Sequence, residues 1–267
     1  MTIIPGYFVK GKGRPLVLLH CSMSSKEQWL GLASLLKEKF KVIGIDLYGY
    51  GQSPFPENTV NFTLDNEIEL IEKVLENVLE KNEKFHLAGH SYGGAVAMKY
   101  STLERKRNIS LCVFEPMLNH VFKEIDYETF LLGKEFISEI ENDVLSGNPK
   151  KGCIKFIDLF SGDGTFEKLP SEIQQIFMNC IKKMPMDYKA TIDEKLNSSI
   201  YKKIDIPVCL ISGEKSPDIT SKISRFIAGV IPGITHFEIN GGHMSPIENS
   251  KLFNPIVKNF FCSLDKK

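Results

Sequence analysis

The chain has 267 residues, of which 42% are hydrophobic and 25% charged, a composition typical of a globular protein with a sizeable core. Its 33 basic and 33 acidic side chains cancel to a formal net charge of zero, which argues against a nucleic-acid-binding protein. No apolar run approaches the ~18 residues of a membrane span, and residues 1–12 show no signal-peptide pattern. The six cysteines form no C-x-x-C pair, so we expect reduced thiols in a cytoplasmic protein, not disulfides or a zinc site.

Four short apolar runs in the first half of the chain predict buried strands, at 15–20, 41–46, 85–89 and 109–114. These runs lack polar alternation, as expected for strands that are covered on both faces. A helical pattern at 64–79 begins beside Thr63, with apolar residues every three or four positions. The acidic residues of this helix, Glu67 among them, are expected to face solvent. Strands that alternate with helices predict a mostly parallel α/β sheet.

The same pattern resumes late, with a strand at 207–212, a helix near 221–228, a strand at 235–239 and a final helix at 252–261. The segment between the two halves shows amphipathic helical patches and no buried-strand run. We therefore expect an α/β core of residues 1–117 and 204–267, with a helical cap inserted at 118–203. Aromatic residues in the cap suggest an apolar pocket, although most of them are expected to fill the cap's own core. They are Tyr127, Phe130, Phe136, Phe156, Phe160, Phe166 and Phe177.

The sequence Gly89-His90-Ser91-Tyr92-Gly93 matches the pattern G-x-S-x-G. It directly follows the third predicted strand and opens an apolar helical segment, which is the context of a nucleophile elbow. Glycines on either side let the backbone double back, so that the serine hydroxyl stands at the carboxyl end of the sheet. A capping serine in a glycine-rich turn is the simpler alternative. The context favours Ser91 as a nucleophile.

A serine hydroxyl needs a base to remove its proton, and His243 suits that role best. It lies in the loop between the last predicted strand and the final helix, directly after two glycines that allow a close approach to the nucleophile. A solvated loop histidine is the alternative. The other five histidines are expected to pack against the sheet, to shape the loop after the first strand, or to lie at the cap entrance. They are His20, His86, His90, His120 and His236.

Two carboxylates fit the chain order of serine, acid and histidine. Glu115 ends the fourth buried run directly before Pro116, so its carboxylate is expected to be half-buried and costly unless it is paired. Asp218 lies in a polar, proline-broken loop after the strand at 207–212, where it suits a turn or a helix start better. We favour Glu115 as the residue that orients the base, with Asp218 as the alternative.

The chain resembles the α/β-hydrolase superfamily over nearly its full length. The residues His20-Cys21-Ser22, followed by Trp29, look like the superfamily's H-G-x loop after strand three. The stretch from Asp46 to Ser53 matches its D-x-x-G-x-G-x-S motif after strand four. Together with the elbow, these motifs in this order are highly specific for the fold. They are much less specific for the reaction.

Two departures from the superfamily pattern bear on the site. Cys21 stands where a glycine is usual, and Ser216 stands where the catalytic aspartate is usual. Members without that aspartate place a glutamate after strand six, as one branch of the haloalkane dehalogenases does, and Glu115 occupies that place. The resemblance further implies an oxyanion hole made by the backbone N–H groups of Tyr92 and Ser22, with Cys21 as the alternative to Ser22.

The resemblance implies a serine hydrolase without cofactor or metal, which cleaves an ester-type bond of a small, apolar substrate through an acyl-enzyme. Carbon–carbon bond hydrolases, thioesterases, lactonases and acyltransferases share the same triad and stay open as alternatives. A serine at the elbow disfavours dehalogenase and epoxide hydrolase chemistry, which uses an aspartate there. A ligand-binding receptor with little turnover is the alternative from another class. A small-molecule substrate is the expected partner, and the sequence does not indicate an oligomeric state.

Overall fold

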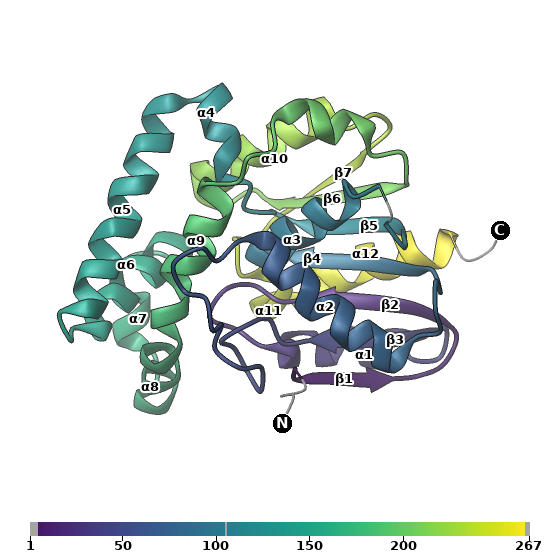
Figure 1. Ribbon diagram of the computed structural model, residues 1–267, viewed down its shortest axis with the longest axis horizontal. Helices are drawn as coiled ribbons and strands as arrows, with labels where there is room; N and C mark the ends of the chain where they lie inside the picture. Colours follow the sequence, from purple (N-terminus) through teal and green to yellow (C-terminus); the bar gives the residue numbers. More distant parts are fainter. Residues whose placement is uncertain (1–4, 105, 265–267) are drawn as a thin grey trace.

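The computed structural model describes residues 5–104 and 106–264. Within them, one sheet has the strand order β1-β3-β2-β4-β5-β6-β7 (Figure 1). The strands are β1 (Tyr7–Lys10), β2 (Arg14–Leu19), β3 (Phe40–Ile45), β4 (Phe85–His90), β5 (Asn108–Phe114), β6 (Val208–Gly213) and β7 (Thr235–Ile239). β1 runs antiparallel to β3, and all other neighbouring pairs are parallel. Residues 1–4, part of the segment expected to lack a signal pattern, lie outside the described residues.

The predicted mostly parallel α/β sheet is confirmed, and the predicted strands agree with the observed ones to within one residue at each end. The edge strand β1 was not predicted, because four residues with only partial burial carry no clear pattern. The helix predicted from Thr63 is α2 (Leu64–Val78), and the Thr63 N–H donates to Asn66 Oδ1 at 2.9 Å. The helix predicted near 221–228 is longer and begins at Asp218, directly after a proline.

Each central strand packs on both of its faces, as its continuous apolar sequence requires. In β2, Val17 and Leu19 join one core cluster, whereas Leu16 and Leu18 join a second cluster on the opposite face. The first cluster includes residues of α2, α3 (Ser91–Ser101) and α10 (Asp218–Val230), and it continues into the helices between β5 and β6. The helices of the second cluster are α1 (Leu30–Leu36) and α12 (Ser250–Leu264). Two short helices complete the core, η1 (Lys26–Trp29) and α11 (Ser245–Glu248).

Between β5 and β6 the described chain consists of helices and connecting loops. They are η2 (Asn119–Val121), α4 (Phe122–Ile125), α5 (Tyr127–Leu145), α6 (Pro149–Ser161), α7 (Thr165–Lys168), α8 (Ser171–Cys180), η3 (Ile181–Lys183), α9 (Met184–Ile192) and η4 (Ser198–Lys203). Helices α5 to α8 lie together at the left of Figure 1, beyond the sheet, and α9 packs against α3. A helical segment is therefore inserted between β5 and β6, where the sequence predicted a cap.

The strand order creates a crevice at the carboxyl ends of β2 and β4. After β2 the chain moves to β3 on one side, whereas β4 lies on the other side of β2. Connections that leave neighbouring parallel strands in opposite directions open a space between them, where ligands of α/β proteins bind. The loop with Ser22 follows β2, and Ser91 follows β4 directly. The topology therefore predicts a ligand site between these two connections.

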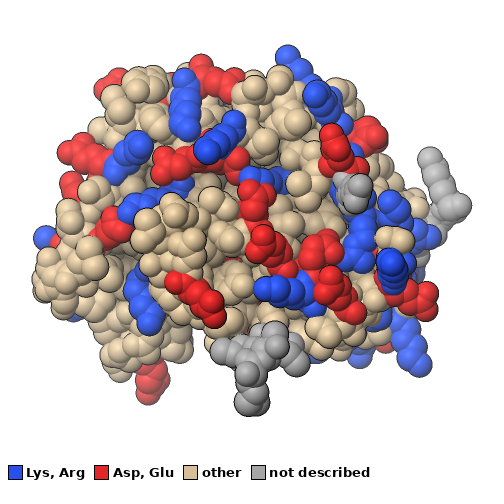
Figure 2. All heavy atoms as spheres, in the orientation of Figure 1, with Lys and Arg blue, Asp and Glu red and all other residues tan. Residues whose placement is uncertain are grey.

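The surface carries no obvious concentration of one charge on the face shown in Figure 2, where acidic and basic side chains are interspersed. This distribution agrees with the formal net charge of zero. Within residues 5–104 and 106–264, no helix is long and apolar enough to cross a membrane.

Candidate active site

The turn from β4 into α3 holds Ser91 in a conformation that L-residues seldom adopt, with φ at +54°. A Cβ atom on Gly89 would lie 2.3 Å from the Gly93 carbonyl oxygen. One on Gly93 would lie 2.4 Å from the His20 carbonyl oxygen. Glycine is therefore required at both positions, because backbone atoms already occupy the space of a side chain. This close-packed turn is the geometry of a nucleophile elbow.

His243 lies between Ser91 and Glu115 and is hydrogen-bonded to both. Its Nε2 is 2.9 Å from Ser91 Oγ, and its Nδ1 is 2.6 Å from Glu115 Oε2. An ionised carboxylate only accepts hydrogen bonds, so Nδ1 carries the proton and Nε2 accepts from the serine hydroxyl. All three residues are buried. The arrangement is a continuous chain of hydrogen bonds from carboxylate through imidazole to hydroxyl.

Glu115 is fixed by the ends of two strands. Its backbone has φ at +41° directly after β5, and its N–H donates to the Ile211 carbonyl oxygen at 3.1 Å. Its second carboxylate oxygen accepts from the Gly213 N–H at 2.7 Å. One oxygen therefore binds the backbone of β6, while the other faces His243. This buried carboxylate has partners on both oxygens, which burial of a charge requires.

Asp218, the alternative acid, lies elsewhere. It is the first residue of α10, its side chain is 68% exposed, and it pairs with Lys222 at 3.1 Å and Arg225 at 3.6 Å. Ser216 occupies the position where the superfamily's aspartate is usual, and its Oγ has no hydrogen-bond partner among the described residues. The structure thus brings Glu115 to His243 and leaves Asp218 on the surface of a helix.

A second chain of hydrogen bonds joins the loop after β2 to the loop that carries His243. Gln28 Oε1 accepts from the Cys21 N–H at 3.2 Å, and Gln28 Nε2 donates to His90 Nδ1 at 3.0 Å. His90 Nε2 in turn donates to the His243 carbonyl oxygen at 2.9 Å. Burial, assisted by the nearby His243, holds the pKa of His90 well below its ordinary value. His90 is therefore a neutral positioning residue, and the contact of Gln28 with it was not predicted from the sequence.

His20 also has a structural role. Its Nε2 accepts from the Leu47 N–H at 3.0 Å, and its Nδ1 donates to the Cys21 carbonyl oxygen at 2.7 Å. Burial lowers the pKa of His20, which keeps the ring neutral in this double contact. His20 thereby joins the loops that follow β2 and β3. The remaining histidines bond to partners within the sheet or near η4, namely His86 to Ser110, His236 to Ser212, and His120 to Tyr201.

Two cavities border Ser91. The larger measures about 100 Å³ and is lined mainly by apolar cap side chains, including Phe156, Phe160 and Phe177, together with His243. The smaller measures about 20 Å³ and has polar residues in its wall. The Phe160 ring lies 4.7 Å from the His243 ring, so the cap covers the imidazole directly.

The cap's other aromatic residues lie away from the larger cavity. Phe130 and Phe166 are buried in the core, and Phe136 packs against Tyr188. Tyr127 is 60% exposed. Three of the seven aromatic residues named from the sequence therefore line the cavity.

The family assignment follows from a family model described as "alpha/beta hydrolase fold", which matches residues 14–250. The chain belongs to the alpha/beta hydrolase fold family. The match spans β2 to the start of α12 and so includes the cap and every residue of the hydrogen-bonded chain. The resemblance inferred from the sequence motifs is confirmed at this level.

Curated relatives and solved structures cover most of this hydrolase. The proline iminopeptidase of Saccharolobus solfataricus is 26% identical, over 95% of this chain and 86% of its own length. The 3-oxoadipate enol-lactonase 1 of Acinetobacter baylyi is 27% identical, over 88% of this chain and 84% of its own length. The crystal structure of the enol-lactonase from Burkholderia xenovorans LB400 has a TM-score of 0.79 at 17% identity, covering 96% of both chains. That structural likeness concerns the fold alone.

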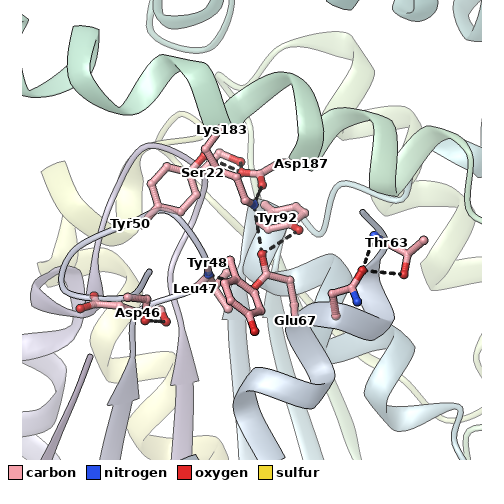
Figure 3. A network of polar contacts seen from close by, with 12 residues as sticks. Ser22, Asp46, Leu47, Tyr48, Tyr50, Thr63, Glu67, Tyr92, Lys183 and Asp187 are labelled. Carbon is pink, nitrogen blue, oxygen red and sulfur yellow. Dashed lines mark hydrogen bonds and ion pairs between the residues drawn. The ribbon is translucent and has the colours of Figure 1, made fainter. Parts of the chain in front are cut away.

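A buried polar network beneath the cap contradicts the expectation that Glu67 faces solvent (Figure 3). Lys183 donates to Glu67 Oε1 at 3.1 Å and to Asp187 Oδ1. All three side chains are almost fully buried, with at most 2% exposure. Glu67 comes from α2, whereas Lys183 and Asp187 come from the cap at the start of α9. The network therefore connects the cap to the core.

Hydroxyl groups from the site join this network. Asp187 Oδ2 accepts from Ser22 Oγ and from Tyr50 Oη, both at 2.6 Å. Glu67 Oε1 accepts from Tyr92 Oη at 3.1 Å. Figure 3 shows the side chains of Ser22, Tyr50 and Tyr92 converging on the two carboxylates. The two residues expected to form the oxyanion hole, Ser22 and Tyr92, are thus both attached to the network through their side chains.

The network's ionisation follows from its burial. Burial raises the pKa of Glu67 above its ordinary value, although Lys183 opposes the shift. Burial alone would lower the pKa of Lys183, but Asp187 and Glu67 beside it raise that pKa above its ordinary value. Lys183 therefore stays charged, and burial favours the neutral form of Glu67.

Proposed function

We propose that this protein is a serine hydrolase that cleaves an ester-type acyl bond of a small substrate through Ser91, His243 and Glu115. The observation that carries the proposal is the His243 ring, which contacts Ser91 Oγ at 2.9 Å and Glu115 Oε2 at 2.6 Å. In this mechanism His243 takes the serine proton as Ser91 attacks the carbonyl carbon, and Glu115 stabilises the resulting imidazolium. His243 then protonates the leaving group, and water releases the acyl-enzyme.

The backbone N–H groups of Tyr92 and Ser22 form the oxyanion hole in this proposal. Tyr92 is the second residue of α3, where a backbone N–H has no partner within the helix. The Cys21 N–H already donates to Gln28, which favours Ser22 over Cys21 as the second donor. One such donor typically contributes about 10²–10³ in kcat.

The cap comprises residues 118–203 in this proposal and encloses the substrate. Contact between Phe160 and His243, together with the burial of Ser91, supports a closed site that limits access of water. The apolar wall of the larger cavity supports a substrate with an apolar part.

Lactone hydrolysis is the second candidate activity. It is supported by the relative from Acinetobacter baylyi, which is named as an enol-lactonase and is 27% identical to this chain. A lactone is a cyclic ester, so attack, oxyanion stabilisation and deacylation use the same groups. The difference is that the leaving alcohol stays attached to the acyl group by the carbon chain throughout, so deacylation releases a single product that carries both groups.

The test is hydrolysis of p-nitrophenyl esters of increasing acyl length, alongside a panel of lactones, by the wild-type protein and by Ser91→Ala. We expect turnover that is lost in Ser91→Ala and kept in Ser216→Ala, a control serine outside the hydrogen-bonded chain. A fluorophosphonate probe should label Ser91 alone. Absence of both turnover and labelling would refute the proposal and favour a ligand-binding protein on this fold.

A further inference from the structure

The two cavities beside Ser91 differ in their relation to His243. Ser22 and Ser91 contribute to both walls, but His243 lines the larger cavity and is not among the described residues that line the smaller one. In acyl transfer the imidazole delivers a proton to the leaving group, which must therefore lie beside it. The larger, apolar cavity accordingly accommodates the leaving group. The smaller cavity then accommodates the acyl chain.

One residue in the wall of the smaller cavity carries a buried acceptor with no partner in the described structure. Asn119 lines this cavity and is 2% exposed. Its Nδ2 donates to Thr191 Oγ1 at 2.7 Å, and that hydroxyl donates its own proton to the Tyr188 carbonyl oxygen at 2.8 Å. These contacts fix the orientation of the amide and leave Oδ1 as the acceptor without a partner. A buried acceptor without a donor is costly, and in a residue that lines a cavity it is a candidate partner for a ligand group.

The carboxylate in the same wall is already satisfied. Asp187 accepts from Lys183, Ser22 and Tyr50, as Figure 3 shows. The remaining acceptor, Asn119 Oδ1, is neutral. A substrate ammonium in this cavity would find no unpaired carboxylate, because Asp187 in the wall is already paired with Lys183. A neutral donor such as a hydroxyl therefore fits better.

We infer that the smaller cavity binds the hydroxyl group of a short acyl chain, with Asn119 Oδ1 accepting its hydrogen bond. The substrates are then esters of small hydroxy acids with an apolar alcohol. A cavity of about 20 Å³ holds roughly one water-sized group, so the acyl chain has to be short. The inference rests on the proposed acyl-transfer function and adds the substrate class to it.

The experiment compares kcat/KM for the phenyl esters of propionate, 2-hydroxypropionate, 3-hydroxypropionate and alanine. We expect one of the two hydroxy esters to exceed the propionate ester about ten-fold or more, because a site built for a hydroxyl disfavours the analogue without it. The alanine ester should show no such gain. A gain for the alanine ester alone would overturn the hydroxy-acid class, and equal rates for all four esters would overturn the subsite.

The variant Asn119→Leu should reduce the ratio of hydroxy ester to propionate ester to about one. Asn108 provides a matched control, because it is equally buried, its Oδ1 also has no partner, and its Nδ2 donates to Ser101 Oγ at 2.7 Å. It begins β5, at the opposite end of the strand from Glu115. The ratio should survive in Asn108→Leu, and its loss there as well would refute the assignment to Asn119.

Binding to Ser91→Ala separates this inference from the proposed function. Ligand-observed NMR would measure the dissociation constants of 2-hydroxypropionamide, 3-hydroxypropionamide and propionamide. Preference for a hydroxy amide without ester turnover by the wild-type protein would support the subsite and refute the hydrolase function. Ester turnover with no preference in either measurement would leave the function standing and refute the subsite.

Discussion

Replacing Lys183 with methionine tests the buried network most directly. The change keeps the length of the side chain but removes the ammonium that lies between the carboxylates of Glu67 and Asp187. Removing one partner of a buried ion pair typically costs about 3–5 kcal/mol, because the remaining charge stays desolvated. Here each carboxylate keeps two other donors. Asp187 still accepts from the hydroxyls of Ser22 and Tyr50. Glu67 still accepts from the Tyr92 hydroxyl and the Tyr48 N–H. The loss should therefore fall near the lower end, at about 3 kcal/mol.

The destabilisation of Lys183→Met should also depend on pH. The raised pKa of Glu67 means that the folded protein keeps this proton to higher pH than the unfolded chain. Its contribution to stability is complete below its ordinary pKa of 4.5 and declines as pH rises. Removing the cation raises the folded-state pKa of Glu67 further, because Lys183 opposes the upward shift in the wild-type protein. The stability difference between wild type and variant should therefore be largest near pH 8 and shrink towards pH 5.

Urea denaturation at three pH values measures this difference. Lys222→Met is the matched control, because Lys222 also lies between two carboxylates, Asp126 at 2.9 Å and Asp218 at 3.1 Å, but is 35% exposed. An exposed pair contributes about 0–1 kcal/mol, so the control should lose little stability. The reasoning is refuted if both variants lose equal stability, or if the deficit of Lys183→Met grows as pH falls.

Two further substitutions test the site and its turn. Glu115→Gln should lower kcat by about 10²–10⁴-fold, because an amide does not stabilise the imidazolium, whereas Asp218→Asn should leave kcat unchanged. Steady-state kinetics with a p-nitrophenyl ester decides between them, and the opposite pattern would reverse the choice of acid. Gly93→Ala should lower the free energy of unfolding by at least about 1–3 kcal/mol, since its methyl group would lie 2.4 Å from a backbone oxygen. Gly229→Ala, which meets no atom within 4 Å in α10, should not destabilise the protein, and similar thermal shifts in both variants would contradict the steric argument.

Local sequence patterns were sufficient to predict six of the seven described strands and to propose the triad. Continuous apolar runs identify strands buried on both faces, and a run of that kind ends directly before Glu115. Ser91 and His243 each follow a strand at the carboxyl end of the sheet, where parallel strands bring distant loops together. The strand pattern therefore already explains why Ser91 and His243, which are 152 positions apart, come into contact.

The buried network escaped prediction because its charges come from separate segments. Lys183 lies 116 positions from Glu67, and its partner nearby in sequence, Asp187, has the i,i+4 spacing of an ordinary solvated helix pair. One signal was present for Glu67. It lies three residues after Leu64 and four before Ile71, and so falls on the apolar face of α2. A carboxylate on the buried face of a helix requires a partner, whatever the composition of the rest of the helix.

The contacts of Ser22 link the cap to the proposed oxyanion hole. The hydroxyl of Ser22 donates to Asp187 in α9, while the adjacent Cys21 N–H is held by Gln28 in η1. The loop after β2 is therefore fixed from the cap on one side and from the core on the other. A displacement of α9 away from the core would break or stretch the bond between Ser22 and Asp187, and Ser22 is one of the two proposed oxyanion donors. In the proposed mechanism, closure of the cap would therefore be coupled to completion of the oxyanion hole.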